Sequence, residues 1–140
     1  MIQRLRRRNR PSLESHMLSP TASDVRVFVP AKDFSISKAF YKALGWKLNW
    51  EDAELAEMEI ADRRFLLQNY YKKEWADNFM IHVSIDDAQA WYELASSIIV
   101  TGKYLDAKVN PPAPQAYGAL VTHLWDPSGV LLHLAQWNHG

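Results

Sequence analysis

The residues with the most potential for chemistry are three histidines in the second half of the chain, His82, His123 and His133. His82 is followed at two-residue intervals by Ser84 and Asp86, in a segment that alternates like a strand. Side chains two positions apart on a strand stand in a row, so this spacing does not aim a nucleophile at its base. The chain also lacks cysteine, a glycine-rich phosphate loop and a Gly-x-Ser-x-Gly motif. These observations argue against nucleophilic catalysis, and we assign no catalytic residue.

The bulk composition narrows the class of protein. A chain of 140 residues with 48% apolar content is the size of one globular domain. Sixteen basic and sixteen acidic residues cancel, which gives no general attraction to nucleic acid or to an anionic membrane. No apolar run approaches the roughly 20 residues needed to span a bilayer. The absence of cysteine suits a reducing compartment, so we expect a cytoplasmic protein without nucleic-acid or membrane partners.

Residues 1–22 differ from the rest of the chain. An arginine cluster between Arg4 and Arg10 precedes His16-Met17, which resembles a cloning junction before a natural start. A transit peptide or a nucleic-acid-binding arm are alternatives for such a cluster. We interpret the segment as a disordered or cloning-derived basic leader and give it no part in function.

The first half of the remaining chain predicts a strand, a helix and a three-stranded meander. Residues 24–30 alternate, with Val25, Val27 and Val29 on one face. Asp33 is placed as the N-cap of a helix that Gly45 ends. Three short strands follow, at residues 46–50, 54–60 and 63–70, with Ala61-Asp62 as a hairpin turn between the last two.

The second half repeats that order. A strand at residues 79–85 is followed by a helix starting at Asp86-Asp87, with Gly102 just past its end. Residues 104–109 form a weakly marked strand, and prolines predict a loop at residues 110–114. Strands at residues 117–125 and 130–137 close the unit as a hairpin.

The repeat predicts the architecture. A four-stranded sheet with one helix leaves a face to bury, so two such units pair around a curved, cleft-bearing sheet. We therefore expect an α+β domain over residues 23–138, built from two βαβββ modules at about 23–72 and 78–138.

Two segments carry a family resemblance. The first is Val29-Pro-Ala-Lys-Asp33, followed by Ser37, Phe40-Tyr41 and Leu44-Gly45-Trp46. The second is Trp125-Asp-Pro-Ser-Gly129, followed by residues 130–136. Their order and spacing resemble the vicinal oxygen chelate superfamily, which includes glyoxalase I, bleomycin-resistance proteins, fosfomycin-resistance enzymes and extradiol dioxygenases. The resemblance covers residues 24–137 and implies a single-domain, bleomycin-resistance-like protein. It also implies a homodimer whose clefts are shared between modules of different subunits.

In metal-dependent members of that superfamily, four cavity-facing positions supply the ligands. The matching motifs carry these positions onto Arg26, Gln68, Met80 and His133. A cationic guanidinium cannot ligate, and a thioether is a poor ligand for hard divalent ions. We therefore expect no metal and no cofactor. The histidines then only line a cavity wall. The alternative is a displaced metal site with Gln68, His82 and His133 as its three ligands.

Arg26 has two interpretations. On a cavity floor, its guanidinium is a bidentate receptor for a carboxylate or phosphate. Alternatively, it is neutralised by an acid of the chain, such as Glu57 or Glu59. The side that His123 faces is also left open, because a bulge in its strand would reverse it.

The sequence thus predicts a metal-free protein that sequesters or senses a small aromatic or anionic ligand, in the manner of the antibiotic-resistance relatives. The predicted ligand-binding residues lie on the strands and at the cleft rim: Arg26, Phe28, Trp50, Gln68, Tyr70, Met80, His82 and His133. One alternative is an enzyme of the same superfamily, either a metal-dependent lyase, isomerase or dioxygenase, or one that uses His133 or His82 as a general base. Another is an interaction protein whose cleft is filled by its own side chains.

Overall fold

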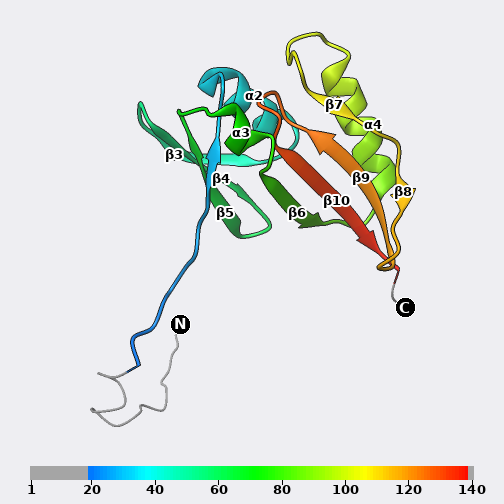
Figure 1. Cartoon of the computed structure of the whole chain (residues 1–140), viewed down its shortest axis with the longest axis horizontal. Helices are drawn as coiled ribbons and strands as arrows, with labels where there is room; N and C mark the ends of the chain where they lie inside the picture. The colour runs from blue at the N-terminus through cyan, green and yellow to red at the C-terminus, as the bar shows by residue number, and fades with distance from the viewer. Residues whose placement is uncertain (1–18, 139–140) are drawn as a thin grey trace.

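The structure, a computed structural model, describes residues 19–138, and the predicted leader therefore lies largely outside the described residues (Figure 1). The first half of the chain forms β2 (Phe28–Pro30), α2 (Phe34–Ala43), β3 (Lys47–Glu51), β4 (Leu55–Ile60) and β5 (Arg63–Gln68). The short helix α3 (Lys73–Ala76) connects the halves. The second half forms β6 (Met80–Ser84), α4 (Ala88–Ile99), β7 (Lys108–Val109), β8 (Ala113–Pro114), β9 (Ala119–Trp125) and β10 (Leu131–Trp137).

Each half folds into its own sheet with the same strand order. The first sheet runs β2-β5-β4-β3, with β2 parallel to β5 and the other pairs antiparallel. The second runs β6-β10-β9-β7, with β6 parallel to β10. In both halves a strand and a helix are followed by strands that return beside the first. The predicted α+β class and the repeated βαβββ order are confirmed.

The local signals at the helix ends and the hairpin turn are as predicted. The Asp33 carboxylate accepts a hydrogen bond from the backbone N–H of Ile36 (3.1 Å) and caps α2. Asp87 caps α4 in the same way. The turn between β4 and β5 is formed by Ala61 and Asp62, both with positive φ (51° and 61°), the sign that a two-residue type I′ hairpin needs.

The edge of the second sheet differs from the prediction. Only Lys108–Val109 of the strand expected at residues 104–109 pairs with β9. Ala113–Pro114, predicted as loop, forms β8 and pairs with Val121 and Leu120. A proline is tolerated there because an outer strand needs hydrogen-bond donors on one side only. Residues 110–112 therefore interrupt one edge strand, and the prediction of a loop was wrong for its last two residues.

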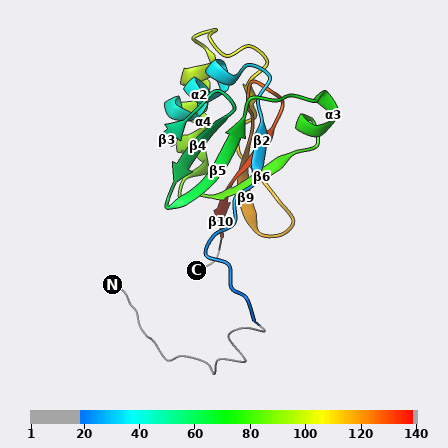
Figure 2. The ribbon, with the colours of Figure 1, turned by 90° about the vertical axis from the view of Figure 1, so that its left-hand side faces the viewer.

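A common core joins the halves. Figure 2 shows α2 and α4 on one side of the molecule and α3 on the opposite side. The buried side chains come from both sheets and from both long helices, and the largest apolar ones are Phe40, Tyr41, Met58, Leu67, Leu124, Leu132 and Leu134. No helix in the part of the chain that the structure describes is long and apolar enough to cross a membrane.

Polar contacts cross the boundary between the halves inside this core. The Tyr41 hydroxyl of α2 donates to an Asp126 carboxylate oxygen at 2.7 Å. The hydroxyls of Ser37 and Ser128 lie 3.2 Å apart, and the backbone N–H of Lys32 donates to Ser128 at 2.8 Å. We call this set, Tyr41, Asp126, Ser37 and Ser128, the clasp. It fastens the β9–β10 turn of the second half to α2 of the first.

Burial controls the charge of the clasp. Asp126 is fully buried, and loss of hydration raises its pKa to about 6. Its carboxylate also accepts backbone N–H bonds from Ser128 (2.7 Å) and Val130 (3.0 Å). These donors and the Tyr41 hydroxyl favour the ionised form and limit the rise. The same burial raises the pKa of Tyr41 well above its usual value, so Tyr41 acts as a donor.

Candidate functional site

The second sheet has one covered face and one open face. Helix α4 lies against one face, where the Thr122 hydroxyl donates to the Ala88 carbonyl at 2.7 Å. Residues one position away on the strands point to the other side. We call that other side the second-sheet face.

Three histidines form a row across the second-sheet face. His133 on β10 is directly opposite His82 on β6 and His123 on β9. The rings of His123 and His133 meet edge to face, with centroids 5.0 Å apart. We call His82, His133 and His123 the histidine row. The orientation of His123, which the sequence left open, is therefore toward the same face as His133.

Aromatic rings frame the row at both ends. The Trp125 ring stacks on His123 with centroids 6.3 Å apart. The ammonium of Lys108 lies 4.5 Å from the centre of the Trp125 ring. At the other end Trp137 contacts His82 (5.6 Å) and Tyr117 (5.5 Å). Flat rings at both ends of a polar row provide stacking surfaces for a flat ligand.

The histidine row has no acidic side chain beside it on the second-sheet face, among the residues that the structure describes. None of the described residues that strand register places on the second-sheet face is acidic. Burial lowers the pKa of His133, and the neighbouring His123 and His82 lower it further. His133 is therefore neutral at pH 7, and its ring offers one donor and one acceptor.

The residues do not fit the metal centre of the metal-dependent relatives. Among residues 19–138 no group of three His, Asp or Glu side chains is placed to hold a metal ion. Met80 puts its sulfur 3.2 Å from His133 Nε2, and Arg26 is an ion-pair partner of Glu57. Gln68 lies at the end of β5 in the first sheet, whereas His82 and His133 lie in the second. A thioether and a paired guanidinium do not suit a hard divalent cation.

The first sheet also has an open face, which we call the first-sheet face, and its charges are paired. Arg26 forms ion pairs with Glu57 and, at 2.5 Å, with Asp24. The Asn49 amide donates to Glu57 at 2.8 Å and to Glu59 at 2.7 Å. The Asn49 hydrogen bond and the charge of Arg26 lower the pKa of Glu57. Arg26 thus has the acid partner that the sequence offered as the alternative to an anion receptor.

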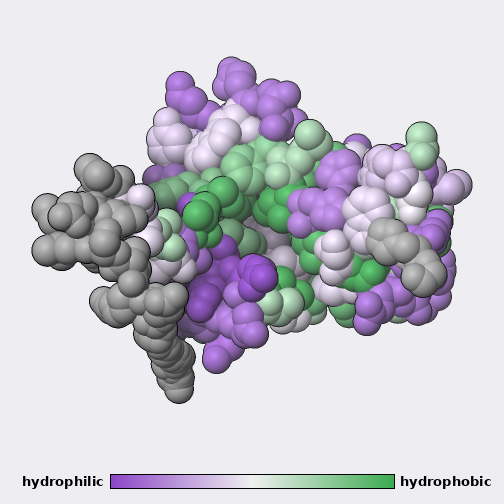
Figure 3. All heavy atoms as spheres, turned by 90° about the horizontal axis from the view of Figure 1, so that it is seen from below, coloured by the Kyte–Doolittle hydropathy of each residue, from purple (hydrophilic) through white to green (hydrophobic). Residues whose placement is uncertain are grey.

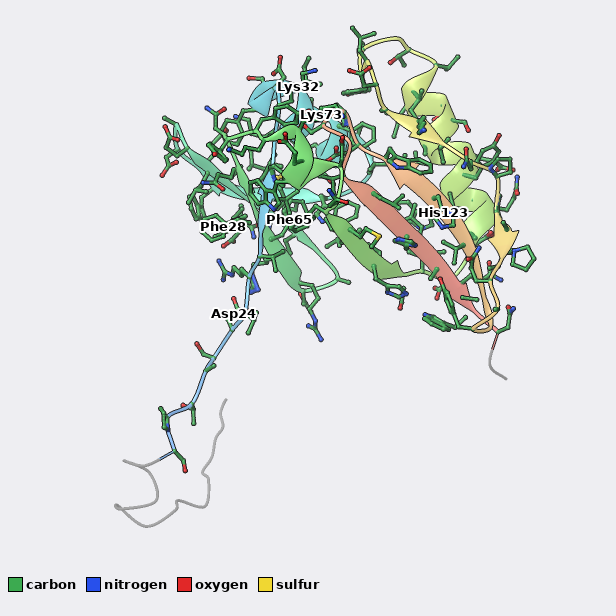
Figure 4. All side chains as sticks on the ribbon, in the orientation of Figure 1. Asp24, Phe28, Lys32, Phe65, Lys73 and His123 are labelled. Atoms are coloured by element: carbon green, nitrogen blue, oxygen red, sulfur yellow. The ribbon has the colours of Figure 1, made fainter. Side chains whose placement is uncertain are left out.

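The predicted ligand-binding residues divide between the two sheets. Phe28, Trp50, Gln68 and Tyr70 lie in the first sheet or just after it, and Phe28, Trp50 and Tyr70 are about half exposed. With Arg26, these form the first group. Met80, His82 and His133 form the second group and share a face. Figure 4 shows the separation through Phe28 and His123, which stand on different sheets.

Four residues in or beside the second-sheet face were missed as site residues: Trp125, Trp137, Tyr117 and Lys108. Trp125 follows His123 by two positions on β9, and that spacing puts both on one face of a strand. Tyr117 and Lys108 carried no such signal, because their positions depend on the turn before β9 and on the interrupted edge.

Comparison with known proteins supports the fold. No family model matches the chain. A bleomycin resistance protein of Klebsiella pneumoniae is 26% identical over 115 residues, which cover 77% of this chain and 87% of that protein. The crystal structure of a bleomycin resistance determinant encoded on the transposon Tn5 superposes with a TM-score of 0.68 at 24% identity, covering 84% of this chain and all of that one. A bleomycin-binding protein complexed with bleomycin superposes with a TM-score of 0.66 at 23% identity, covering 82% of this chain and 98% of that one. The chain therefore has the vicinal oxygen chelate fold, and its predicted resemblance to the bleomycin-resistance-like proteins of that superfamily is confirmed.

Proposed function

We propose that the protein is a metal-free binder that sequesters or senses a small, flat, aromatic ligand on the second-sheet face. The observation that carries this proposal is the histidine row, framed by Trp125 and Trp137 and without an acidic neighbour on its face. Aromatic pairs contribute about 0.5–1.5 kcal/mol each beyond the area they bury. Stacking on the two tryptophans supplies affinity in this proposal, and the histidines select the ligand by hydrogen bonding.

The charge of the face favours a ligand with an acidic or strongly electron-rich substituent. Lys108 brings a positive charge to Trp125. The acids of the first-sheet face are already paired and are not placed on this face. The first group of predicted residues lies in or beside the first sheet. It would join the site only if the first sheet of another copy of the chain faced the second-sheet face. This group is Arg26, Phe28, Trp50, Gln68 and Tyr70.

We propose that a homodimer brings the two kinds of face together, as the resemblance implies. Large apolar side chains are left exposed on both sheets of the single chain: Phe28 (45% exposed), Trp50 (44%) and Met80 (63%). Burial of such side chains by a second copy would be favourable. Light scattering coupled to gel filtration should then give about twice the chain mass of 16.2 kDa. A mass of one chain would remove the dimer from the proposal. We also propose a cytoplasmic location, on the absence of cysteine.

Bleomycin is the first probe, because both the curated relative and the solved structures carry its name. Naphthalene-2-sulfonate is the second, because it is flat and anionic. We expect at least one of them to quench tryptophan fluorescence with saturation at one molecule per chain. Trp125→Ala should weaken that binding at least tenfold. Tyr92→Ala, on helix α4 behind the sheet, is the matched control and should change nothing.

Two outcomes would overturn the assignment. One is the absence of saturable binding for both probes. The other is saturable binding that Trp125→Ala and Trp137→Ala leave unchanged, which would place the ligand elsewhere on the molecule.

A further inference from the structure

A cavity of about 550 Å³ lies between the β4–β5 hairpin and strand β6, and His82 of the histidine row borders it. Figure 3 views the side of the molecule on which the surface is hollowed between hydrophobic residues. Its larger apolar lining side chains are Val27, Trp46, Ile60, Phe65, Ile81 and Val83. Four consecutive residues of β6, from Ile81 to Ser84, border it, so it runs along the strand edge that is not paired with β10. Its volume falls within the roughly 300–1,000 Å³ of ordinary ligand pockets.

The polar lining of the cavity includes two arginines, and one of them, Arg63, has no acidic partner among the described residues. Arg63, Arg64 and His82 border the cavity, and no carboxylate does. Arg64 lies 3.7 Å from Glu59, on the first-sheet face. Arg63 makes no ion pair with any described residue, and its guanidinium reaches only the backbone oxygen of Asp62 at 3.4 Å. Arg63 is thus an exposed cation at the border of an apolar cavity, with donors available for an anion.

The hairpin turn fixes the place of Arg63. Ala61, which also lines the cavity, has a φ of 51°. A residue with a Cβ in this left-handed region costs about 1–2 kcal/mol relative to the right-handed one. The turn is tight, and Arg63 begins β5 directly after it. The guanidinium therefore projects from a short, ordered hairpin.

We propose that this cavity is a second binding site, which meets the second-sheet face at His82 and Ser84 and takes an apolar organic acid. The hydrocarbon or aryl body fills the space between Trp46, Phe65 and Val83, and the carboxylate pairs with Arg63. A bidentate pairing of guanidinium and carboxylate is the strongest hydrogen-bonded arrangement that this lining offers.

The test compares two probes of equal chain length on the full-length protein, decanoate and decanol. Both are titrated against bound 1-anilinonaphthalene-8-sulfonate, whose fluorescence reports displacement. The titration is repeated with Trp125→Ala, because the dye is a flat aromatic sulfonate that the second-sheet face would also bind. We expect decanoate to displace the dye about tenfold more effectively than decanol, since one charge-assisted contact is worth about that factor. Arg63→Gln should remove the difference, and Arg63→Lys should restore part of it. Lys103→Gln, which removes an exposed charge beyond α4, is the control for net charge and should preserve the difference.

The variants separate this site from the second-sheet face. Trp125→Ala should leave decanoate binding unchanged, and Arg63→Gln should leave bleomycin binding unchanged. Ile81→Phe narrows the cavity and should weaken decanoate and decanol alike. Equal displacement by the two probes, failure of both, or a decanoate preference that survives Arg63→Gln would overturn the proposal.

Discussion

The two sheets share a strand order, yet their open faces differ in charge pairing: the described polar side chains are paired on one and lack an acidic partner on the other. On the first-sheet face Arg26, Glu57 and Asn49 satisfy one another. On the second-sheet face the histidine row faces outward with no acid beside it. Equal topology therefore does not imply equal use. The acids of the first-sheet face already accept hydrogen bonds from its own side chains, whereas no acid among the described residues lies beside the histidines of the second-sheet face.

If this comparison is right, removing Glu57 should damage stability more than any change on the other face. Glu57 is 6% exposed, and its loss leaves Arg26 and Asn49 without their shared acceptor. We expect Glu57→Ala to lower the free energy of unfolding by about 2 kcal/mol, within the range for breaking partly buried polar networks. Urea unfolding followed by circular dichroism measures this. Glu59→Ala, at the edge of the same network, should cost less, and an equal cost for both would mean that burial of Glu57 is unimportant.

A substitution on the second-sheet face should weaken ligand binding and leave the free energy of unfolding nearly unchanged. Trp125→Ala should weaken binding of the responding probe, bleomycin or naphthalene-2-sulfonate, at least tenfold, which is about 1.4 kcal/mol. The urea midpoint should move much less than for Glu57→Ala, because Trp125 is only half-buried. The pair of measurements sharpens the contrast between the faces. A large loss of stability in Trp125→Ala would instead make that ring part of the scaffold.

The two faces should also respond to acid in different pH intervals. The pKa of His133 is lowered by burial, so the unfolded chain binds more protons than the folded one below the usual value of 6.5. Its contribution to stability is complete above pH 6.5 and is lost as the pH falls. The pKa of Glu57 is also lowered, so its contribution is lost only below its ordinary value of 4.5.

The pH dependence due to His133 must be measured as a difference between parent and variant. The reason is that the titration of Asp126 changes the unfolding free energy of the parent in the opposite direction. Its raised pKa, about 6, makes the folded state gain stability as the pH falls from 6 toward 4. The difference in unfolding free energy between the parent and His133→Gln should therefore shrink from pH 7 to pH 5. The difference for Glu57→Gln should stay constant over that interval. A constant difference for His133→Gln would show that its ring is equally hydrated in both states.

The smallest expected effect concerns the hairpin turns of the two sheets. The first-sheet turn places Ala61 at a φ of 51°, whereas the second-sheet turn places Gly129 at 98°. Ala61→Gly should relieve strain and raise the free energy of unfolding by about 0.5 kcal/mol, after the added flexibility of the unfolded chain is counted. Gly129→Ala should do the reverse, since a residue with a Cβ is strained at a φ of 98°. Thermal unfolding resolves the sign, and a lower melting temperature for Ala61→Gly would contradict the strain argument.

Local chemistry explains why most of the fold could be predicted from the sequence. Caps at Asp33 and Asp87 and two-residue alternation in the strands depend only on neighbouring residues. The prediction failed at Ala113–Pro114 because pairing at a sheet edge depends on which strand lies alongside. A proline excluded from a central strand is acceptable there.

The site was harder to predict, because its decisive contacts are distant in sequence. The shared face of Met80 and His82 follows from their spacing on one strand. The pairing of Arg26 with Glu57 joins residues 31 positions apart, and two equally reasonable partners were visible in the sequence. The direction of His123 depended on whether its strand was bulged, and the unbroken register of β9 and β10 decided it.

The clasp has a consequence for how quickly a ligand is captured. Tyr41 and Asp126 join the halves through a buried hydrogen bond inside a continuous core, so the boundary between the halves is not a hinge. A single chain therefore does not bind its ligand by closing its two halves around it. Encounter with a surface already in place sets the association rate, which should increase linearly with ligand concentration and show no plateau in stopped-flow mixing.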